Sequence, residues 1–325
     1  SQECLDIMEN EEKSEPDQSN NTSERICKDA HHIIFTSDHD ENGSMTFKIF
    51  VPLKNEWFGG GEFHIGMFQW DTVVIDNEIV LIGWPLLKYR TDKLVLVLYD
   101  NEKKEWTEKT VMGEMFDCVF DVSYEAIGRT VYFAGGALYD KKLLRTVYSF
   151  NPFVPNPVCM RLADMRRERA RAASCVLNGK LYMLGGGGSS VTWSDGEWYD
   201  PETDKWTRIA PKKKEDRHYA AAAFNGEIYV VGDYFEKYSP ATNTWTTLKS
   251  SIIPRAYPTL VASCGVLYSM GGWGEGSTSY VQTMERFDPK TGNWETMSDM
   301  SGKGRKHICA LPIPSSFPTP LSNEE

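Results

Sequence analysis

Positively charged side chains gather at four places in an otherwise acidic chain. They are Arg166, Arg167, Arg169 and Arg171; Lys212, Lys213, Lys214 and Arg217; Arg255; and Lys303, Arg305 and Lys306. A guanidinium is a planar fork of donors that matches a carboxylate or a phosphate, so these stretches could bind an acidic or phosphorylated partner. Acidic neighbours such as Glu168, Glu215 and Asp216 leave a second interpretation open, a solvated surface with local ion pairs.

Other motifs with catalytic or metal-binding potential are incomplete. The glycine run 185–188 is followed by two serines but lacks the Gly-Lys-Ser/Thr ending of a phosphate-binding loop. Neither a Gly-x-Ser-x-Gly elbow nor a His-Glu-x-x-His motif occurs. The 6 histidines are scattered without the spacing of metal ligands. We therefore expect no catalytic residue, no metal site and no cofactor.

The cysteines indicate a reducing compartment. There are 7 of them, an odd number, and no Cys-x-x-Cys pair occurs. Cys118, Cys175, Cys264 and Cys309 lie in apolar stretches, where a free thiol behaves as a small core residue. We expect a cytoplasmic location, with the nucleus as a second compartment, and no signal peptide.

Composition excludes two classes of protein. The chain has 325 residues with 35 Lys and Arg against 46 Asp and Glu, a net charge of −11, which argues against a general nucleic-acid binder. No apolar run approaches the length of a bilayer span, so we expect no membrane protein. The 10 Trp, 15 Tyr and 26 Gly favour strands joined by tight turns.

A repeated sequence motif indicates where these strands lie. It ends at Trp57, Trp106, Trp206, Trp245 and Trp294. The intervals are 49, 100, 39 and 49 residues, so the second interval holds two periods with one tryptophan missing. A period of roughly 50 residues is typical of a propeller blade or a solenoid unit.

The clearest unit spans residues 172–206. Two apolar runs meet at Asn178-Gly179, which predicts a hairpin with a type I′ turn. Gly185-Gly186 ends the second run and permits a sharp bend. Tyr199-Asp200-Pro201 ends a third strand because proline cannot continue the ladder, and the phrase around Trp206 forms a fourth.

Related units lie at about 128–152, 225–245 and 265–294, with weaker ones at 77–106 and 32–57. The weakest unit lacks its opening strand, and residues 306–311 near the chain end supply an unpaired candidate. The sequence therefore predicts an all-β, six-bladed propeller closed by pairing of the C-terminal strand with the N-terminal blade.

The domain prediction has three parts. Residues 1–30 carry nine acids against three bases and few aromatic residues, so we expect an acidic, disordered tail. Residues 31–311 form the propeller, and residues 312–325, rich in Pro and Ser, form a loose C-terminal tail.

The order of di-glycine, Tyr-Asp-Pro and Trp resembles the kelch repeat, over residues from about 31 to 311. Departures are Gly83-Trp84 and Gly232-Asp233 in place of the second glycine, and the missing Trp of the third unit. The resemblance implies a non-enzymatic, protein-binding platform. It is similar to the substrate-receptor propellers of BTB–BACK–kelch and F-box–kelch adaptors of cullin-based ubiquitin ligases, although no adaptor domain is present in this sequence. The alternatives are an actin-binding scaffold and, as a weaker hypothesis, a copper enzyme like galactose oxidase.

The resemblance also implies that the loops between blades and those between second and third strands open on one face. Arg171, seven residues before Asn178, would be a pocket residue, and His218 and Tyr257 are its equivalents. The candidate partner-binding residues are Arg171, Arg217, His218, Arg255, Tyr257, Arg305, Ser189, Ser190, Trp193, Tyr234, Trp273 and Tyr280. The unit between Trp206 and Trp245 is short near Gly232, which predicts a groove that accepts an extended peptide there.

Overall fold

A computed structural model provides the structure of the chain. It describes residues 33–39, 44–51, 55–64, 67–76, 78–85, 93–100, 105–113, 120–138, 140–188, 191–213, 220–274, 280–299 and 309–313. These residues form strands, turns and loops, and none of them lies in a helix. Accordingly, the described part of the chain holds no helix capable of crossing a bilayer.

The strands form six antiparallel sheets of four, numbered here along the chain. Sheet 1 contains β26 (Cys309–Ile313), β1 (Ile33–His39), β2 (Ser44–Val51) and β3 (Glu56–His64). Sheet 2 contains β4 (Met67–Ile75), β5 (Glu78–Pro85), β6 (Val95–Asp100) and β7 (Glu105–Thr110). Sheet 3 contains β8 (Ser123–Ile127), β9 (Thr130–Ala134), β10 (Val147–Phe150) and β11 (Met160–Arg161).

Sheet 4 contains β12 (Ala173–Leu177), β13 (Lys180–Leu184), β14 (Gly196–Asp200) and β15 (Lys205–Ile209). Sheet 5 contains β16 (Ala220–Phe224), β17 (Glu227–Val231), β18 (Phe235–Ser239) and β19 (Thr244–Thr247). Sheet 6 contains β21 (Thr259–Ser263), β22 (Val266–Met270), β24 (Glu285–Asp288) and β25 (Asn293–Thr296). A further two-stranded ribbon pairs β20 (Arg255–Ala256) with β23 (Trp273–Gly274).

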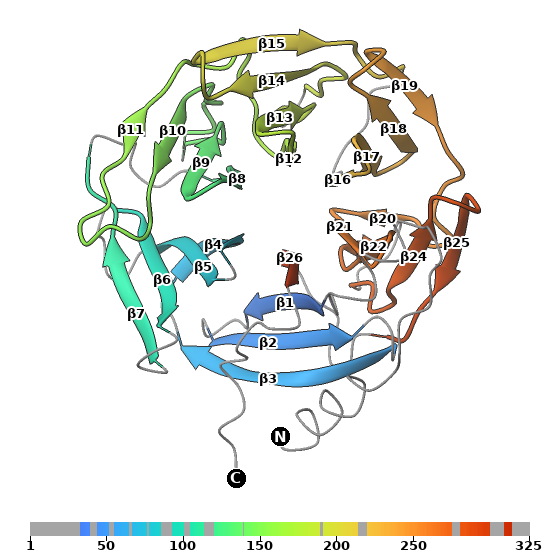
Figure 1. Cartoon of the computed structure of the whole chain (residues 1–325), viewed down its shortest axis with the longest axis horizontal. Coiled ribbons are helices and arrows are strands. Elements are labelled where there is room, and N and C mark those ends of the chain that lie inside the picture. Colours follow the sequence, from blue (N-terminus) through green and yellow to red (C-terminus); the bar gives the residue numbers. More distant parts are fainter. Residues whose placement is uncertain are drawn as a thin grey trace, which may run out of the picture.

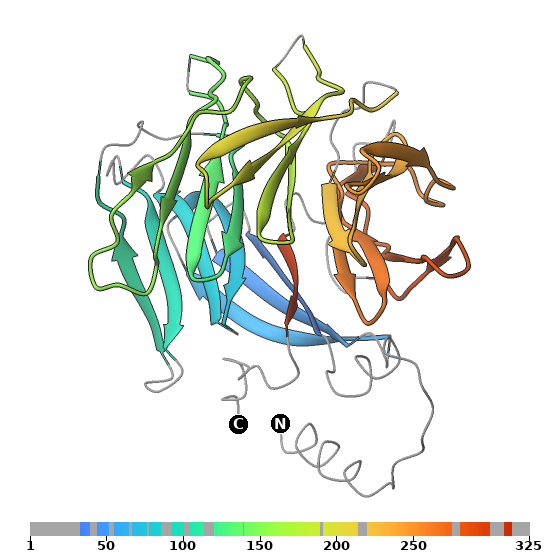
Figure 2. The ribbon, with the colours of Figure 1, turned by 45° about the horizontal axis from the view of Figure 1, so that its top comes forward.

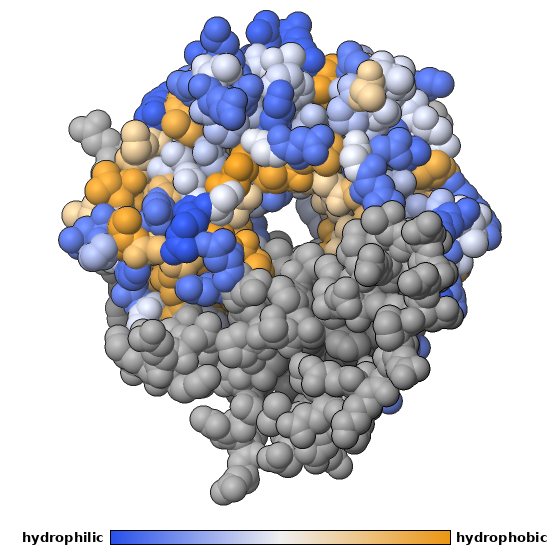
Figure 3. Space-filling model, in the orientation of Figure 1, coloured by the Kyte–Doolittle hydropathy of each residue, from blue (hydrophilic) through white to orange (hydrophobic). Residues whose placement is uncertain are grey.

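The sheets stand around a common centre, with β26, β4, β8, β12, β16 and β21 innermost and β3, β7, β11, β15, β19 and β25 at the periphery (Figure 1). The space-filling view shows a central channel there (Figure 3). Figure 2 shows that each sheet is twisted, as expected for strands of L-residues. Contacts join the innermost strands in the order β4–β8–β12–β16–β21–β26–β4. In sheet 1 the C-terminal strand β26 pairs with β1, with Phe35 opposite Leu311. The all-β propeller architecture is confirmed.

The hydrophobic core lies between neighbouring sheets. One cluster packs Tyr132 of sheet 3 against Tyr199 and Trp206 of sheet 4, and another packs Phe235 of sheet 5 against Phe287 of sheet 6. Burying one large apolar side chain contributes about 1.5–3 kcal/mol, so each sheet is held mainly by its neighbours.

The repeated residues have the roles expected of them. Asn178 and Gly179 have φ of 52° and 71°, as the predicted type I′ turn requires. At Gly135 an added Cβ would clash with the carbonyl oxygen of Arg169, which explains the di-glycine. The repeated tryptophan anchors its sheet to the preceding one: Trp206 Nε1 donates to the carbonyl of Ala163 at 2.9 Å, and Trp245 Nε1 to that of Ala210 at 2.7 Å.

Two details differ from expectation at the ends of units. Strand β26 continues through Pro312 and Ile313, so the expected start of the C-terminal tail at residue 312 is wrong. In the third unit, which lacks the tryptophan, the outer strand β11 comprises only Met160–Arg161. The predicted acidic tail, residues 1–30, lies outside the described residues.

Candidate functional site

Three equivalent residues adopt an unusual backbone conformation at the mouth of the channel. Asp121, Arg171 and Tyr257 each lie just before an innermost strand, β8, β12 and β21, and their φ angles are 56°, 55° and 55°. Such left-handed angles are uncommon in residues other than glycine and cost of order 1 kcal/mol or more. The same conformation thus recurs at equivalent places in sheets 3, 4 and 6, as the left-handed turn residues Asn178, Asn225 and Cys264 recur in sheets 4, 5 and 6.

The three side chains meet although they come from different sheets. Arg171 Nε donates to Asp121 Oδ2 at 2.8 Å, and Arg171 Nη1 lies 3.4 Å from the Tyr257 hydroxyl. Arg171 remains 51% exposed and Asp121 32% exposed. Partial burial acts to lower the pKa of Arg171, but the Asp121 carboxylate and Tyr257 outweigh it and hold that pKa above its ordinary value. We call Asp121, Arg171 and Tyr257 the mouth cluster.

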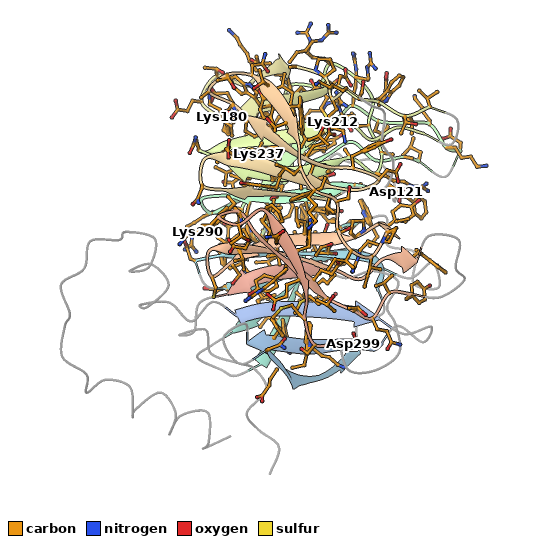
Figure 4. The ribbon with its side chains drawn as sticks, turned by 90° about the vertical axis from the view of Figure 1, so that its right-hand side faces the viewer. Asp121, Lys180, Lys212, Lys237, Lys290 and Asp299 are labelled. Carbon is orange, nitrogen blue, oxygen red and sulfur yellow. The ribbon has the colours of Figure 1, made fainter. Side chains whose placement is uncertain are left out.

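The mouth cluster lies on the face formed by the loops, as the resemblance implied. In sheets 3 and 4 a backbone bridge joins the loop before the innermost strand to the loop between the second and third strands, Phe120 with Ala137 and Ala170 with Gly187, and in sheet 6 the ribbon of β20 and β23 does the same. Figure 4 shows Asp121 at this face, whereas Lys180 and Lys290 lie at the opposite face. A partner that binds Arg171 therefore approaches from the loop side and meets a cation already paired with Asp121.

The expectation that Arg255 supplies a free charge to this face is wrong. Its side chain is 1% exposed, and Nη2 lies 2.6 Å from Oε2 of the equally buried Glu285. Burial lowers the pKa of Arg255, and the Glu285 carboxylate offsets this only in part. A buried charge needs a partner of opposite sign, and the glutamate in the third strand of the sheet provides it.

Two other cations of the expected basic rim are also internal. Arg169 pairs with Glu197 at 3.1 Å, and Lys212 pairs with Glu236 at 3.2 Å, each between side chains less than a tenth exposed. These glutamates occupy the same place as Glu285, in β14 and β18. Among the described cations of the expected rim, Arg169, Lys212 and Arg255 are therefore internal and offer no charge to a partner.

The predicted aromatic residues brace their own loops. The Arg167 guanidinium stacks on the Trp193 ring at 4.1 Å, and Trp193 Nε1 donates to the Glu168 carbonyl at 3.2 Å. The rings of Trp273 and Tyr280 lie 4.2 Å apart. All three aromatic side chains are half-buried, so each keeps a face that a partner could contact.

The short loop predicted near Gly232 is present. Residues 232–234 alone join β17 to β18, and the Gly232 N–H donates to the Tyr234 carbonyl at 3.1 Å. The corresponding loops of sheets 4 and 6 run 185–195 and 271–284. The remaining predicted site residues lie outside the described part of the chain; they are Ser189, Ser190, Arg217, His218 and Arg305.

Asp121 is not among the site residues predicted from the sequence. Its signal was its place relative to Gly135-Gly136, which matches that of Arg171 relative to Gly185-Gly186. An acid at the position that Arg and Tyr hold in other units is a potential partner for them.

A second polar group lies deeper, on the innermost strands. Glu125 of β8 accepts a hydrogen bond from the Ser174 hydroxyl of β12 at 2.8 Å. Burial raises the pKa of Glu125 to about 7; the Ser174 hydrogen bond lowers it, and Asp71 of β4 raises it further. The described residues contain no group of three or more His, Cys, Asp or Glu side chains that could hold a metal ion.

Glu125 should make stability depend on pH. An acid whose pKa is raised in the folded state binds its proton more tightly there, so its stabilising effect is full below about pH 4.5 and is lost as pH rises through about 7. Between pH 5 and pH 8 we expect the unfolding free energy of the wild-type protein to fall by about 1–2 kcal/mol, the size being moderated by solvent contact. Glu125→Gln should not show this fall. Urea unfolding at both pH values measures it, with the exposed Glu202→Gln as control.

Comparison with known proteins agrees with this geometry. The Kelch motif matches residues 168–213 and 254–301. Human kelch-like protein 23 is 25% identical over 279 residues, which cover 80% of this chain and 47% of that protein. Alpha-scruin of Limulus polyphemus is 28% identical over 254 residues, covering 68% of this chain and 27% of that protein.

The solved structure of YjhT shares the fold, with a TM-score of 0.50 at 16% identity over 57% of this chain and 67% of that one. This chain spans about half the length of kelch-like protein 23. The repeated sheets, the matched motif and the relatives agree: the chain is a β-propeller that contains kelch motifs and is similar to kelch-like proteins.

Proposed function

We propose that this chain is the recognition module of a larger cytoplasmic or nuclear protein and binds an acidic or phosphorylated segment of a partner at the mouth cluster. In this proposal the six sheets act as one closed, six-bladed ring that presents the loops as a rigid surface. The module binds and does not catalyse. Its most specific form is the substrate receptor of a cullin-based ubiquitin ligase.

The observation that carries the proposal is the meeting of Asp121, Arg171 and Tyr257 at one point, each in a strained conformation. An exposed guanidinium with one carboxylate partner has donors left for a second anion. A carboxylate or phosphate of the partner would accept from the remaining Arg171 donors, and the Tyr257 hydroxyl would add a neutral contact.

Neighbouring loops supply the contact area. The stacked pair Arg167 and Trp193 stands beside this region on sheet 4, and Trp273 with Tyr280 stands on sheet 6. Sheet 5 lies between sheets 4 and 6, and its short loop 232–234 extends less far than the corresponding loops of its neighbours. An extended peptide is the shape that fits such a passage, with Arg and Trp as the residues that most often carry binding energy.

The ligase role rests on similarity to kelch-like proteins rather than on a feature of the site. Because this chain spans about half of kelch-like protein 23, a cullin-binding part would belong to chain outside this sequence. Actin binding is the alternative that the same experiment addresses.

Reversing the charge of Arg171 should remove partner binding. We expect affinity capture with Arg171→Glu to recover specific partners at least about tenfold less well than wild type, as for a central charged contact. The matched control is Arg208→Glu, because Arg208 is an exposed arginine on the outer strand β15. Quantitative mass spectrometry of both captures measures the difference, and equal losses for the two variants would contradict the proposal.

Two additions to the capture experiment identify the chemical class of the ligand. Asp121→Asn should strengthen binding, since it removes the anion that competes for Arg171. Phosphatase treatment of the lysate abolishes capture if the ligand is a phosphate and leaves it intact if it is a carboxylate. Saturable co-sedimentation with actin filaments that persists in Arg171→Glu would instead favour the scaffold hypothesis.

A further inference from the structure

An apolar patch lies on the outer edge of sheet 3, away from the mouth cluster. The described residues include seven large hydrophobic side chains that are exposed, and four of them belong to this edge. They are Met112, Val154, Val158 and Met160. Val158 is 55% and Met160 64% exposed, so they contribute most of the uncovered surface. We call these four residues the sheet 3 edge.

Backbone contacts hold the patch together. The Met112 N–H donates to the Pro157 carbonyl at 2.8 Å, and the Cys159 N–H donates to the Met112 carbonyl at 2.7 Å. Met112 therefore lies beside Val158 in a parallel bridge. Val158 and Met160 are two residues apart in an extended segment, so their side chains point to the same side. In Figure 3 apolar side chains gather at the periphery where Figure 1 places β11.

The patch is open because the third unit lacks the tryptophan and most of the fourth strand. Strand β11 contains two residues, whereas β15 of sheet 4 runs Lys205–Ile209. The Leu162 N–H donates to Val147 of β10, and Met160 lies opposite Ser149. By the antiparallel alternation, the N–H and C=O of Arg161 point outward, and no described backbone pairs with them. An added strand could bind there.

Cations border the patch. Lys93 Nζ lies 4.0 Å from the Met112 sulfur, and Lys109 Nζ donates to the carbonyls of Pro152 and Val154 at 3.0 and 3.4 Å. These two ammonium groups lie beside exposed apolar side chains, so an occupant that combines apolar residues with acids fits the patch.

Four side chains make a small patch. A stable dimer buries about 800 Å² on each partner, so this edge fits a short segment better than a second copy. The chain itself carries a segment of matching chemistry. Leu5 and Ile7 alternate with Asp6, and Glu9, Glu11 and Glu12 follow. Residues 13–32 separate this segment from β1 and can span up to about 65 Å, enough to pass sheet 2.

We propose that residues 3–12 of the acidic N-terminal tail dock on the sheet 3 edge as an extended strand. Leu5 and Ile7 pack on Val158 and Met160, and the acids pair with Lys93 and Lys109. Tethering raises the effective concentration to about the millimolar range, so a weak contact suffices. This docking does not involve the mouth cluster and stands independently of the function proposed for it.

Hydrogen exchange of the full chain tests the proposal. We expect Leu5→Asp/Ile7→Asp to speed exchange of the amides of residues 110–113 and 158–162 by about tenfold relative to wild type, because a bound tail protects them. The control Ser14→Asp/Ser19→Asp adds the same charge to the same tail and should leave this exchange unchanged. Both variants alter only the tail, so folding of the propeller is not at issue.

A patch variant gives the reciprocal result. With a photo-crosslinker in place of Ile7, crosslinks should map to residues 109–113 or 154–161. The substitution Met160→Asp should abolish these crosslinks. The control Ile252→Asp replaces an exposed apolar residue elsewhere and should retain them. Unchanged exchange in Leu5→Asp/Ile7→Asp, or crosslinks confined to other sheets, would overturn the proposal. So would crosslinks that form only between chains at high concentration, which would identify a second copy as the occupant.

Discussion

Replacing Glu285 with glutamine is expected to lower the free energy of unfolding by about 3–5 kcal/mol, because it leaves the buried Arg255 charge without its partner. Glu285 also accepts the N–H groups of Ile252 and Ile253 at 2.7 and 3.2 Å. Arg255 in turn donates to the Thr283 carbonyl at 3.0 Å. The pair thus ties the loop before sheet 6 to the loop between β22 and β24. Urea unfolding measures the loss.

The control comes from the same sheet. Arg286 and Glu295 form an ion pair at 2.7 Å whose side chains are 38% and 61% exposed. Glu295→Gln should therefore cost only about 0–1 kcal/mol. Similar losses for Glu285→Gln and Glu295→Gln would show that burial does not govern these pairs. For the same reason a charge reversal at Arg255 cannot test partner binding, since it would damage the fold.

Three sheets contain such a buried ion pair, and these pairs explain why the predicted basic rim is wrong at Arg169, Lys212 and Arg255. Arg169 with Glu197, Lys212 with Glu236 and Arg255 with Glu285 each join a loop to a third strand. In sheet 5 the residue equivalent to Arg169 is Asp216, and Lys212 from earlier in the loop supplies the cation instead. The signal in the sequence is a glutamate at the same place in the last three units, Glu197, Glu236 and Glu285, each preceded by a cation in the loop before its sheet.

Local features could be predicted because they depend on neighbours in sequence. The Asn178-Gly179 turn needs two left-handed residues, and the repeated tryptophans need one carbonyl of the preceding sheet. Periodicity then predicts the ring, because each unit repeats the same hairpins. The shortness of β11 is not predicted, although the missing tryptophan of the third unit removes the anchor of its outer strand.

The mouth cluster could be predicted only in part, because ring geometry rather than sequence distance brings its members together. Asp121 and Arg171 are 50 residues apart, and Arg171 and Tyr257 are 86 apart. Equivalence between units identified Arg171 and Tyr257, but nothing local shows that side chains of sheets 4 and 6 can touch past sheet 5. That contact depends on the width of the channel, which the whole ring sets.

Ending the chain at residue 305 should destabilise the whole propeller. The deletion removes β26, which pairs with β1 and contacts β4 and β21, so these contacts between innermost strands would be lost at sheet 1. Cooperative stability needs each sheet to pack on two neighbours, as Phe50 of sheet 1 does on Tyr268 of sheet 6. We expect a loss of about 5 kcal/mol or more, which corresponds to a fall in Tm of roughly 10–20 °C.

A chain ending at residue 314 is the matched control, because it keeps β26 intact and removes only residues 315–325. Its melting temperature by calorimetry should equal that of the full chain. If the chain ending at residue 305 melted like the control, closure by β26 would contribute nothing, and the proposal of a closed six-bladed ring would fail. If a synthetic peptide of residues 306–314 restored the Tm of the shortened chain, pairing with β1 would be identified as the cause, because backbone hydrogen bonds can be supplied from a separate chain.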